Sequence, residues 1–267
     1  MVIGACDRIL VMKRLLKSLC MRGLSYVLGD ESAKVVFYHD VGFAHTRMGT
    51  TFELLQAHVD AARKYGWTFS TGKPSLNHEL SICFDDGFRG ILDARSFFLR
   101  EKIRPTIFIA VSLVGKPHYL TWDEILSLQD DGFIFQSHTW SHQTLVGPMI
   151  DESPAEERSD VWFDRELRQS REFLADRLGC PVTALCFPAG HFSDDVIKRA
   201  GKAGYSHLYA SFPGKIPIND DATGKPLVIP RCLVQGLAVA DFEAVLRGGM
   251  NPLRRRYLKQ HYFRETK

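Results

Sequence analysis

The sequence has no closely spaced cysteine pair, no long hydrophobic run and no strong excess of charge of one sign. Its six cysteines are scattered and none forms a Cys-x-x-Cys pair, which excludes a disulfide framework. No stretch is long and apolar enough to predict a membrane-spanning helix. The chain has 267 residues, of which 45% are hydrophobic and 24% are charged. This composition is typical of a globular protein with one large core.

The small net charge of +3 is distributed unevenly along the chain. Residues 1–30 carry five Lys or Arg against two Asp, and residues 251–267 carry six against one Glu. The two ends therefore carry +3 and +5, which leaves −5 for the body between them. An acidic body with basic ends is not the pattern of a nucleic-acid-binding protein, so we expect no nucleic-acid partner. The basic ends suit contact with an anionic membrane surface.

Between residues 34 and 247, strand patterns alternate with helix patterns. Runs rich in β-branched and aromatic residues predict strands at 34–39, 80–84, 106–111, 132–136, 182–187, 207–211 and 227–229. Amphipathic runs predict helices at 51–65, 88–101, 121–130, 163–178, 193–204 and 240–247. Such alternation favours parallel strands covered by helices. We therefore expect an α/β fold, a distorted (β/α) barrel of about seven parallel strands.

The basic ends lie outside this alternation. We divide the chain into an amphipathic basic N-terminal helix at 1–30, a catalytic barrel at 31–250 and a basic C-terminal tail at 251–267. The N-terminal helix either covers one end of the barrel or lies in a membrane interface, and both interpretations stay open. Arg8, Lys13, Arg14 and Lys17 interrupt its apolar stretch, which argues against a signal peptide. We expect a cytoplasmic protein, with peripheral contact to the inner membrane face if the helix binds lipid.

Two short segments about fifty residues apart carry residue types suited to metal-assisted hydrolysis. The first ends an apolar strand with Asp85-Asp86-Gly87, and the second runs from His138 to His142 after a later strand. Two imidazoles and one carboxylate can hold a divalent metal and leave coordination positions open. The other carboxylate can then take a proton from water. Because both segments follow strands, a parallel barrel would bring them together at its C-terminal face.

At these residues the sequence resembles the polysaccharide deacetylase family of metal-dependent carbohydrate esterases. The resemblance spans residues 34–235, with Phe-Asp-Asp-Gly at 84–87 and His-Thr-Trp-Ser-His at 138–142. It implies that Asp86, His138 and His142 bind a divalent metal and that Asp85 is the general base. We expect Zn²⁺, although cobalt, nickel and iron accept the same ligands.

A third family motif, Arg-x-Pro-Tyr, keeps only its proline here, in Phe187-Pro188-Ala189-Gly190. The resemblance implies that the backbone N–H of Ala189 stabilises the oxyanion, a main-chain role that tolerates the missing tyrosine. The family's arginine, which orients the base, is also missing. Arg231 follows a predicted strand and is a candidate replacement, with a structural or surface ion pair as the open alternative.

The general acid is assigned by the same resemblance. Many members carry it near the C-terminus, but the only histidine after residue 207 is His261, in the basic tail, which we interpret as non-catalytic. One branch of the family instead has Tyr-His near the N-terminus, and Tyr38-His39 matches it. His39 would then protonate the departing amine, with Asp40 a weaker candidate for orienting it.

Together these features predict a metal-dependent N-deacetylase, a hydrolase of non-peptide C–N bonds. Its substrate would be an N-acetylated amino sugar of a glycan, of a glycolipid, or of a lipid-linked or nucleotide-linked glycan precursor. Two alternatives stay open: a deformylase or other C–N amide hydrolase on the same scaffold, and a carbohydrate-binding protein with a degenerate site. The sequence does not predict the oligomeric state.

Overall fold

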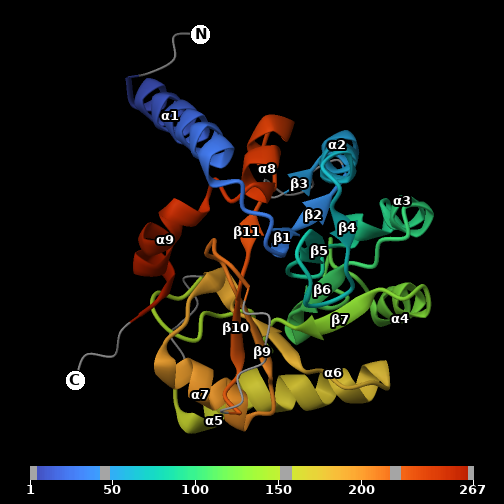
Figure 1. Ribbon diagram of the computed structural model, residues 1–267. Coiled ribbons are helices and arrows are strands. Elements are labelled where there is room, and N and C mark those ends of the chain that lie inside the picture. Colours follow the sequence, from blue (N-terminus) through green and yellow to red (C-terminus); the bar gives the residue numbers. More distant parts are fainter. Residues whose placement is uncertain (1–4, 43–48, 151–157, 217–223, 264–267) are drawn as a thin grey trace.

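The computed structural model describes residues 5–42, 49–150, 158–216 and 224–263 (Figure 1). Its main sheet has the strand order β10-β9-β8-β7-β6-β5-β1-β11, and every pairing is parallel. These strands are β1 (Lys34–Tyr38), β5 (Glu79–Phe84), β6 (Thr106–Ile109), β7 (Ile134–Ser137), β8 (Ala184–Cys186), β9 (His207–Ala210), β10 (Leu227–Pro230) and β11 (Cys232–Leu233). Short strands β2 (Asp40–Val41) and β3 (Gly49–Thr50) pair with each other, and β4 (Thr68–Phe69) pairs with β5.

The two ends of this strand order meet in one stretch of chain, which closes the ring. β10 pairs with β9, β11 pairs with β1, and only Arg231 separates β10 from β11. Counting β10 and β11 as one interrupted strand, seven stretches of the described chain surround the axis. The structure confirms the predicted distorted (β/α) barrel.

Side chains alternate between the inside and the outside of the ring, as parallel strands require. On β1, for example, Val35 and Phe37 join a small interior cluster, whereas Val36 and Tyr38 face the covering helices. The interior cluster also takes residues from β5, β6, β8, β9 and β10, so the barrel is filled by side chains.

Helices surround the barrel (Figure 1). They are α1 (Ala5–Leu28), α2 (Phe52–Lys64), α3 (Arg95–Arg100), α4 (Trp122–Asp130), α5 (Asp160–Asp164), α6 (Ser170–Leu178), α7 (Asp194–Lys202), α8 (Val239–Leu246) and α9 (Arg254–His261). Single 3₁₀ turns occupy Arg89–Leu92, Val111–Leu113, Pro188–Gly190 and Asn251–Leu253. At α4 a capping box forms between Thr121 and Glu124. No helix in the described part of the chain is long and apolar enough to cross a bilayer.

Two helices differ from the prediction. The expected helix at 88–101 is broken into a 3₁₀ turn and the short α3, and Gly90 of the 3₁₀ turn packs closely against β2. A Cβ at this position would overlap the Val41 carbonyl and the Asp40 carboxylate. The helix expected at 163–178 begins earlier, at Asp160, and contains a π turn at Arg165–Gln169 between α5 and α6.

The two basic ends pack against the barrel layer. α1 lies on α8 and buries Met21 and Ser25 there. At the other end, residues 251–263 form α9 and a short extension that pairs with Phe192 through Tyr262. The segment we expected to be a separate C-terminal tail is therefore, as far as residue 263, part of the layer that covers the barrel.

Candidate active site

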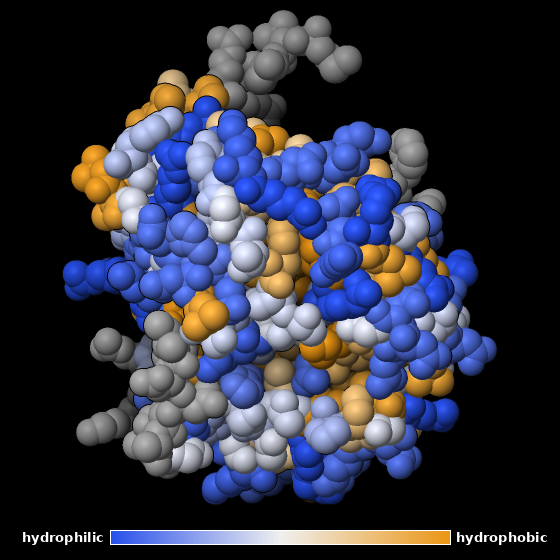
Figure 2. All heavy atoms as spheres, turned by 45° about the vertical axis from the view of Figure 1, so that its right-hand side comes forward, coloured by the Kyte–Doolittle hydropathy of each residue, from blue (hydrophilic) through white to orange (hydrophobic). Residues whose placement is uncertain are grey.

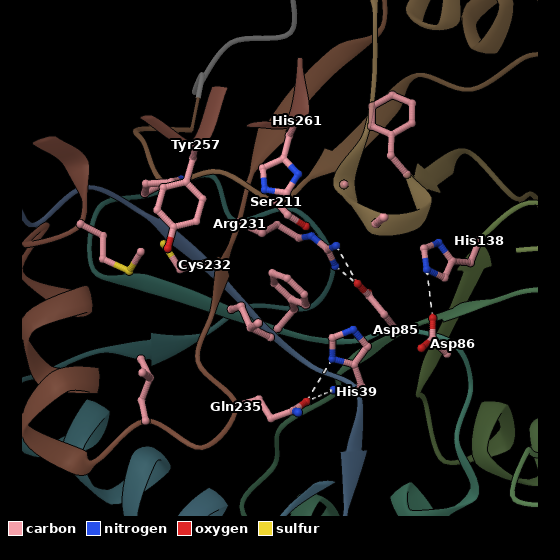
Figure 3. Close-up of a pocket in the computed structure, with 18 of the residues that line it drawn as sticks. His39, Asp85, Asp86, His138, Ser211, Arg231, Cys232, Gln235, Tyr257 and His261 are labelled. Carbon is pink, nitrogen blue, oxygen red and sulfur yellow. Dashed lines mark hydrogen bonds and ion pairs between the residues drawn. The ribbon is translucent and has the colours of Figure 1, made fainter. Parts of the chain in front are cut away.

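The residues singled out in the sequence converge on the C-terminal face of the barrel. Asp85 and Asp86 follow β5, His138 follows β7, and Arg231 follows β10. With His39, His142 and Ala189 they line one cavity of about 490 Å³ (Figure 3). The structure therefore brings together all seven predicted site residues, which come from five strand ends and the loops after them.

The three predicted metal ligands lie close together. Asp86 Oδ1 is 3.1 Å from His138 Nε2 and 2.9 Å from His142 Nε2. One ligand atom from each residue lies within 4.8 Å of the other two. Burial alone would raise the pKa of Asp86, but the adjacent imidazoles outweigh it and hold that pKa well below its ordinary value. Asp86 is therefore an ionised, acceptor-only group at neutral pH.

The hydrogen bonding of His138 makes this arrangement fit a cation. Its Nδ1 lies 2.8 Å from the carbonyl oxygen of Cys186, which can only accept, so Nδ1 carries the hydrogen. In the neutral ring Nε2 then presents a lone pair toward Asp86 (Figure 3). Two lone pairs facing each other are unfavourable unless a proton or a metal cation lies between them. A backbone carbonyl on the far nitrogen is also the usual outer support of a metal-ligating histidine.

The backbone around the ligands is strained. Asp86, Thr139, His142 and Ala189 all adopt left-handed φ values, between 53° and 70°, although none is glycine. Each such residue costs about 1–3 kcal/mol and persists only where surrounding contacts hold it. Three of them line the cavity and Thr139 lies between the two histidines, which indicates a geometry that the rest of the fold enforces.

A residue that we did not predict, Glu166, supports the histidine loop. It lies in the π turn between α5 and α6 and is fully buried. Its Oε2 accepts hydrogen bonds from the backbone N–H groups of Trp140 and Ser141, at 3.1 and 2.8 Å. Arg165 pairs with its other carboxylate oxygen at 3.2 Å. Glu166 thereby holds the turn between His138 and His142, both of which face Asp86.

Arg231 donates two parallel hydrogen bonds to Asp85, from Nη1 to Oδ1 at 2.7 Å and from Nη2 to Oδ2 at 2.8 Å (Figure 3). Its guanidinium is buried above the ring of Phe37, 4.1 Å from the centroid. The alternative of a surface ion pair is therefore wrong. Burial raises the pKa of Asp85, but the charge and hydrogen bonds of Arg231 outweigh it and lower that pKa.

Cys186 adds a second group of ligand-type atoms, with Asp85 and His138. This group does not suit a metal. Burial raises the pKa of the Cys186 thiol well above its ordinary value, so the thiol keeps its proton. Arg231 already occupies both oxygens of Asp85. Among the described residues, Asp86, His138 and His142 are the better ligand set.

On the other side of the cavity, His39 is oriented by Gln235, a second residue that we did not predict. Gln235 Oε1 accepts from the His39 backbone N–H at 3.1 Å and lies 3.0 Å from its Nδ1 (Figure 3). A shared acceptor oxygen means that Nδ1 carries a hydrogen, which leaves Nε2 as the site for a second proton. Asp40, our weaker candidate for this task, instead accepts from Val41 N–H.

The C-terminal helix also reaches the cavity. Tyr257 and His261 of α9 line it together with Ala189. In the sequence analysis we interpreted His261, in the basic tail, as non-catalytic. The structure shows it beside the loop that carries the expected oxyanion donor.

A family model described as polysaccharide deacetylase matches residues 72–208, slightly more than half of the chain. The chain belongs to the polysaccharide deacetylase family. The matched span of this family member contains Asp85, Asp86, His138, His142 and Ala189. His39, Arg231 and Gln235 lie outside it, so the fold alone joins them to the matched motifs.

Similar proteins agree with this assignment. YxkH of Bacillus subtilis (strain 168), named for the same family, is 27% identical over 143 residues, which are 53% of this chain and 47% of YxkH. The chain thus spans about half the length of that curated relative. IcaB from Ammonifex degensii has a TM-score of 0.69 at 18% identity, covering 82% of this chain and 98% of IcaB. The Streptococcus pyogenes deacetylase PplD has a TM-score of 0.67 at 16% identity, covering 81% and 99%. At these identities the two structures establish a shared deacetylase-family fold.

Proposed function

We propose that this protein is a metal-dependent N-deacetylase that removes acetyl groups from amino sugars of a glycan or a glycan precursor. One observation carries the proposal: the two adjacent carboxylates contact different partners. Asp86 faces His138 and His142, whereas Asp85 is held by Arg231. A degenerate binding protein would have no need to keep the two carboxylates apart.

A divalent cation held by Asp86, His138 and His142, with zinc as our proposal, would polarise the acetyl carbonyl and make a nearby water more acidic. The protein contributes the geometry around it. Asp85 accepts the proton of the attacking water. Because Arg231 binds both oxygens of Asp85, the carboxylate cannot rotate away from the cavity. The same contact keeps Asp85 ionised at neutral pH.

The departing amine must be protonated, since an amine anion is a very poor leaving group. His39 lies in the cavity with Nδ1 fixed by Gln235, so Nε2 can deliver the proton. The backbone N–H of Ala189, in the strained turn after β8, is the proposed donor to the oxyanion. The overall reaction adds water across the amide and yields acetate and the free amine.

The substrate class rests on the family and on the cavity. A volume of about 490 Å³ suits one sugar residue with its acetamido group. The related deacetylase PplD was crystallised in complex with acetate, the product that this reaction releases. We propose an N-acetylated glycan or a lipid-linked precursor as the substrate.

The test measures acetate release from N-acetylated glycans and lipid-linked sugars and formate release from their N-formyl counterparts, before and after chelation and zinc return. We expect acetate release that chelation abolishes and zinc restores. The matched control is Asp123→Asn, which changes an aspartate in the first turn of α4 that does not line the cavity. Formate as the main product would replace the proposal with a deformylase. Absence of stoichiometric metal would favour the degenerate binder.

A further inference from the structure

The helix α1 turns its apolar stripe away from the protein. Six large apolar residues recur at helical spacing and are exposed: Met12, Leu15, Leu16, Leu19, Tyr26 and Val27. At about 100° per residue they occupy roughly one third of the helix circumference. Leu19 is 67% exposed and Val27 is 83% exposed. Figure 2 shows hydrophobic residues at the upper edge of the molecule, where α1 lies in Figure 1.

The opposite side of α1 makes the contacts with the barrel layer, and it is mostly polar. Ser18 and Arg22 both donate to Asp241 of α8, at 2.6 and 2.7 Å. Met21 and Ser25 are buried on the same side. A surface helix of a globular protein normally buries its apolar stripe and exposes its polar face. Here the order is reversed, and an exposed apolar stripe of this size marks an interaction surface.

Exposed cations lie on α1 outside the stripe and on the neighbouring α9. Lys17 of α1 and Arg255, Arg256 and Lys259 of α9 are all exposed. Lys17 Nζ lies 2.9 Å from the hydroxyl of Tyr257, so the two helices are joined. Neither residues 12–28 nor residues 254–261 include an Asp or Glu. The surface formed by α1 and α9 is therefore apolar and cationic.

This surface borders the catalytic cavity. A second cavity of about 500 Å³ lies between α1 and the barrel, lined by Ser18 and Met21. It shares Lys17, Leu233 and Gln235 with the catalytic cavity. The catalytic cavity therefore lies toward the barrel side of α1 and toward α9, whereas the apolar stripe lies on the outer side of α1.

We propose that α1 and α9 form a docking surface for an anionic bilayer. The apolar stripe would lie among the acyl chains at the interface, and the exposed cations would contact lipid phosphates. The positive charge of this surface favours an anionic bilayer over a second copy of the chain as its partner. A symmetric dimer through the stripe would bring two sets of these cations together, whereas anionic headgroups neutralise them. If the proposed function also holds, such docking would hold the protein at the surface that carries lipid-linked glycans.

The experiment is co-sedimentation of the full chain with vesicles of phosphatidylcholine alone, or mixed equally with phosphatidylglycerol, at low salt. We expect binding to the anionic vesicles and a loss of about tenfold or more in the double variant Leu15→Glu/Leu19→Glu. Replacing Arg255, Arg256 and Lys259 by Gln should weaken binding about fivefold for each cation removed. The matched control is Leu76→Glu, because Leu76 is 66% exposed outside α1. Circular dichroism checks that each variant is folded.

Three results would overturn the proposal. The first is a wild-type protein that stays in the supernatant with anionic vesicles. The second is a Leu15→Glu/Leu19→Glu protein that sediments like the wild type. The third is a lipid-free dimer that this variant converts to a monomer, which would show that a second copy covers the stripe. Deacetylase activity plays no part in this assay, so the two proposals can fail separately.

Discussion

Arg231 and Asp85 are 146 positions apart in the chain, yet they form a bidentate ion pair where the last strand closes the barrel. Arg231 occupies the single-residue gap between β10 and β11, where the last stretch of chain completes the ring. The residue at which the fold closes therefore also fixes the proposed base. This relationship links the stability of the barrel to the geometry of the reaction.

Replacing Arg231 by Lys should preserve the charge but lose the paired geometry, because an ammonium group cannot bind both carboxylate oxygens in parallel. We expect a folded protein whose kcat falls about 100-fold, as for a small misplacement of a catalytic group. Steady-state kinetics with thermal unfolding as a check would measure this. Arg89→Lys, in an exposed pair with Glu124, is the control. An unchanged kcat in Arg231→Lys would remove the positioning role.

The adjacent aspartates should respond differently to the same substitution. Asp86→Asn should lose bound metal, because an amide is a weak ligand, and activity should fall with it. Asp85→Asn should retain metal and lose turnover, although the uncompensated buried charge of Arg231 will destabilise it by about 3–5 kcal/mol. Metal content and acetate release measured on the same folded samples separate the two. Full activity in Asp85→Asn would contradict the assignment of the base.

Glu166→Ala should weaken metal binding about 10–100-fold, the usual effect of removing an outer-shell support. The loss of the two acceptor contacts to Trp140 and Ser141 would free the histidine loop. Glu166→Gln keeps an acceptor oxygen and should bind metal nearly as well as the wild type. Glu172→Ala, on the exposed side of α6, is the control. Titration with zinc would measure the affinities, and equal values for Glu166→Ala and wild type would refute the supporting role.

His58 should make the protein less stable in mild acid. Its ring is fully buried, with Nδ1 2.9 Å from the Tyr38 hydroxyl and Nε2 2.9 Å from the Leu237 carbonyl oxygen. Burial lowers the pKa of His58 below its ordinary value. The unfolded chain therefore binds a proton that the folded one does not, and stability falls as pH drops below about 6.5, by up to about 1.4 kcal/mol per pH unit.

The measurement is urea unfolding across this pH range for the wild type and His58→Gln. The variant should be less stable overall but should depend less on pH. His118→Gln, at an exposed histidine, should leave the pH dependence of the wild type intact. Equal slopes in the wild type and His58→Gln would show that another group controls the response.

The sequence was sufficient to locate the candidate metal ligands and Asp85 in one cavity, because each lies in a short motif that follows a strand. The parallel barrel likewise followed from the regular alternation of strand and helix patterns. Gln235 could not be predicted, since it is 196 positions from His39 and no pattern joins them. Glu166 left one usable signal: it lies beside Phe163 and Leu167 on a buried helix face, where an unexplained carboxylate indicates a buried partner.

The ends of the chain were harder to interpret for a different reason. Residues 254–261 look like a solvated basic tail because Arg and Lys dominate their composition. The anchoring comes from neighbouring aromatic contacts, with Tyr257 and Tyr262 packed against the core and Tyr262 paired with Phe192. The composition of a segment gives its charge, but it does not predict which part of the folded protein its aromatic side chains will pack against.

Anomalous diffraction at the zinc absorption edge, from crystals grown with zinc, tests the central claim most directly. We expect one strong peak about 2.0–2.2 Å from an oxygen of Asp86 and from Nε2 of His138 and His142. Asp85 should remain paired with Arg231 and make no bond to the metal. A peak bonded to Asp85, or no peak between the two histidines, would contradict the account.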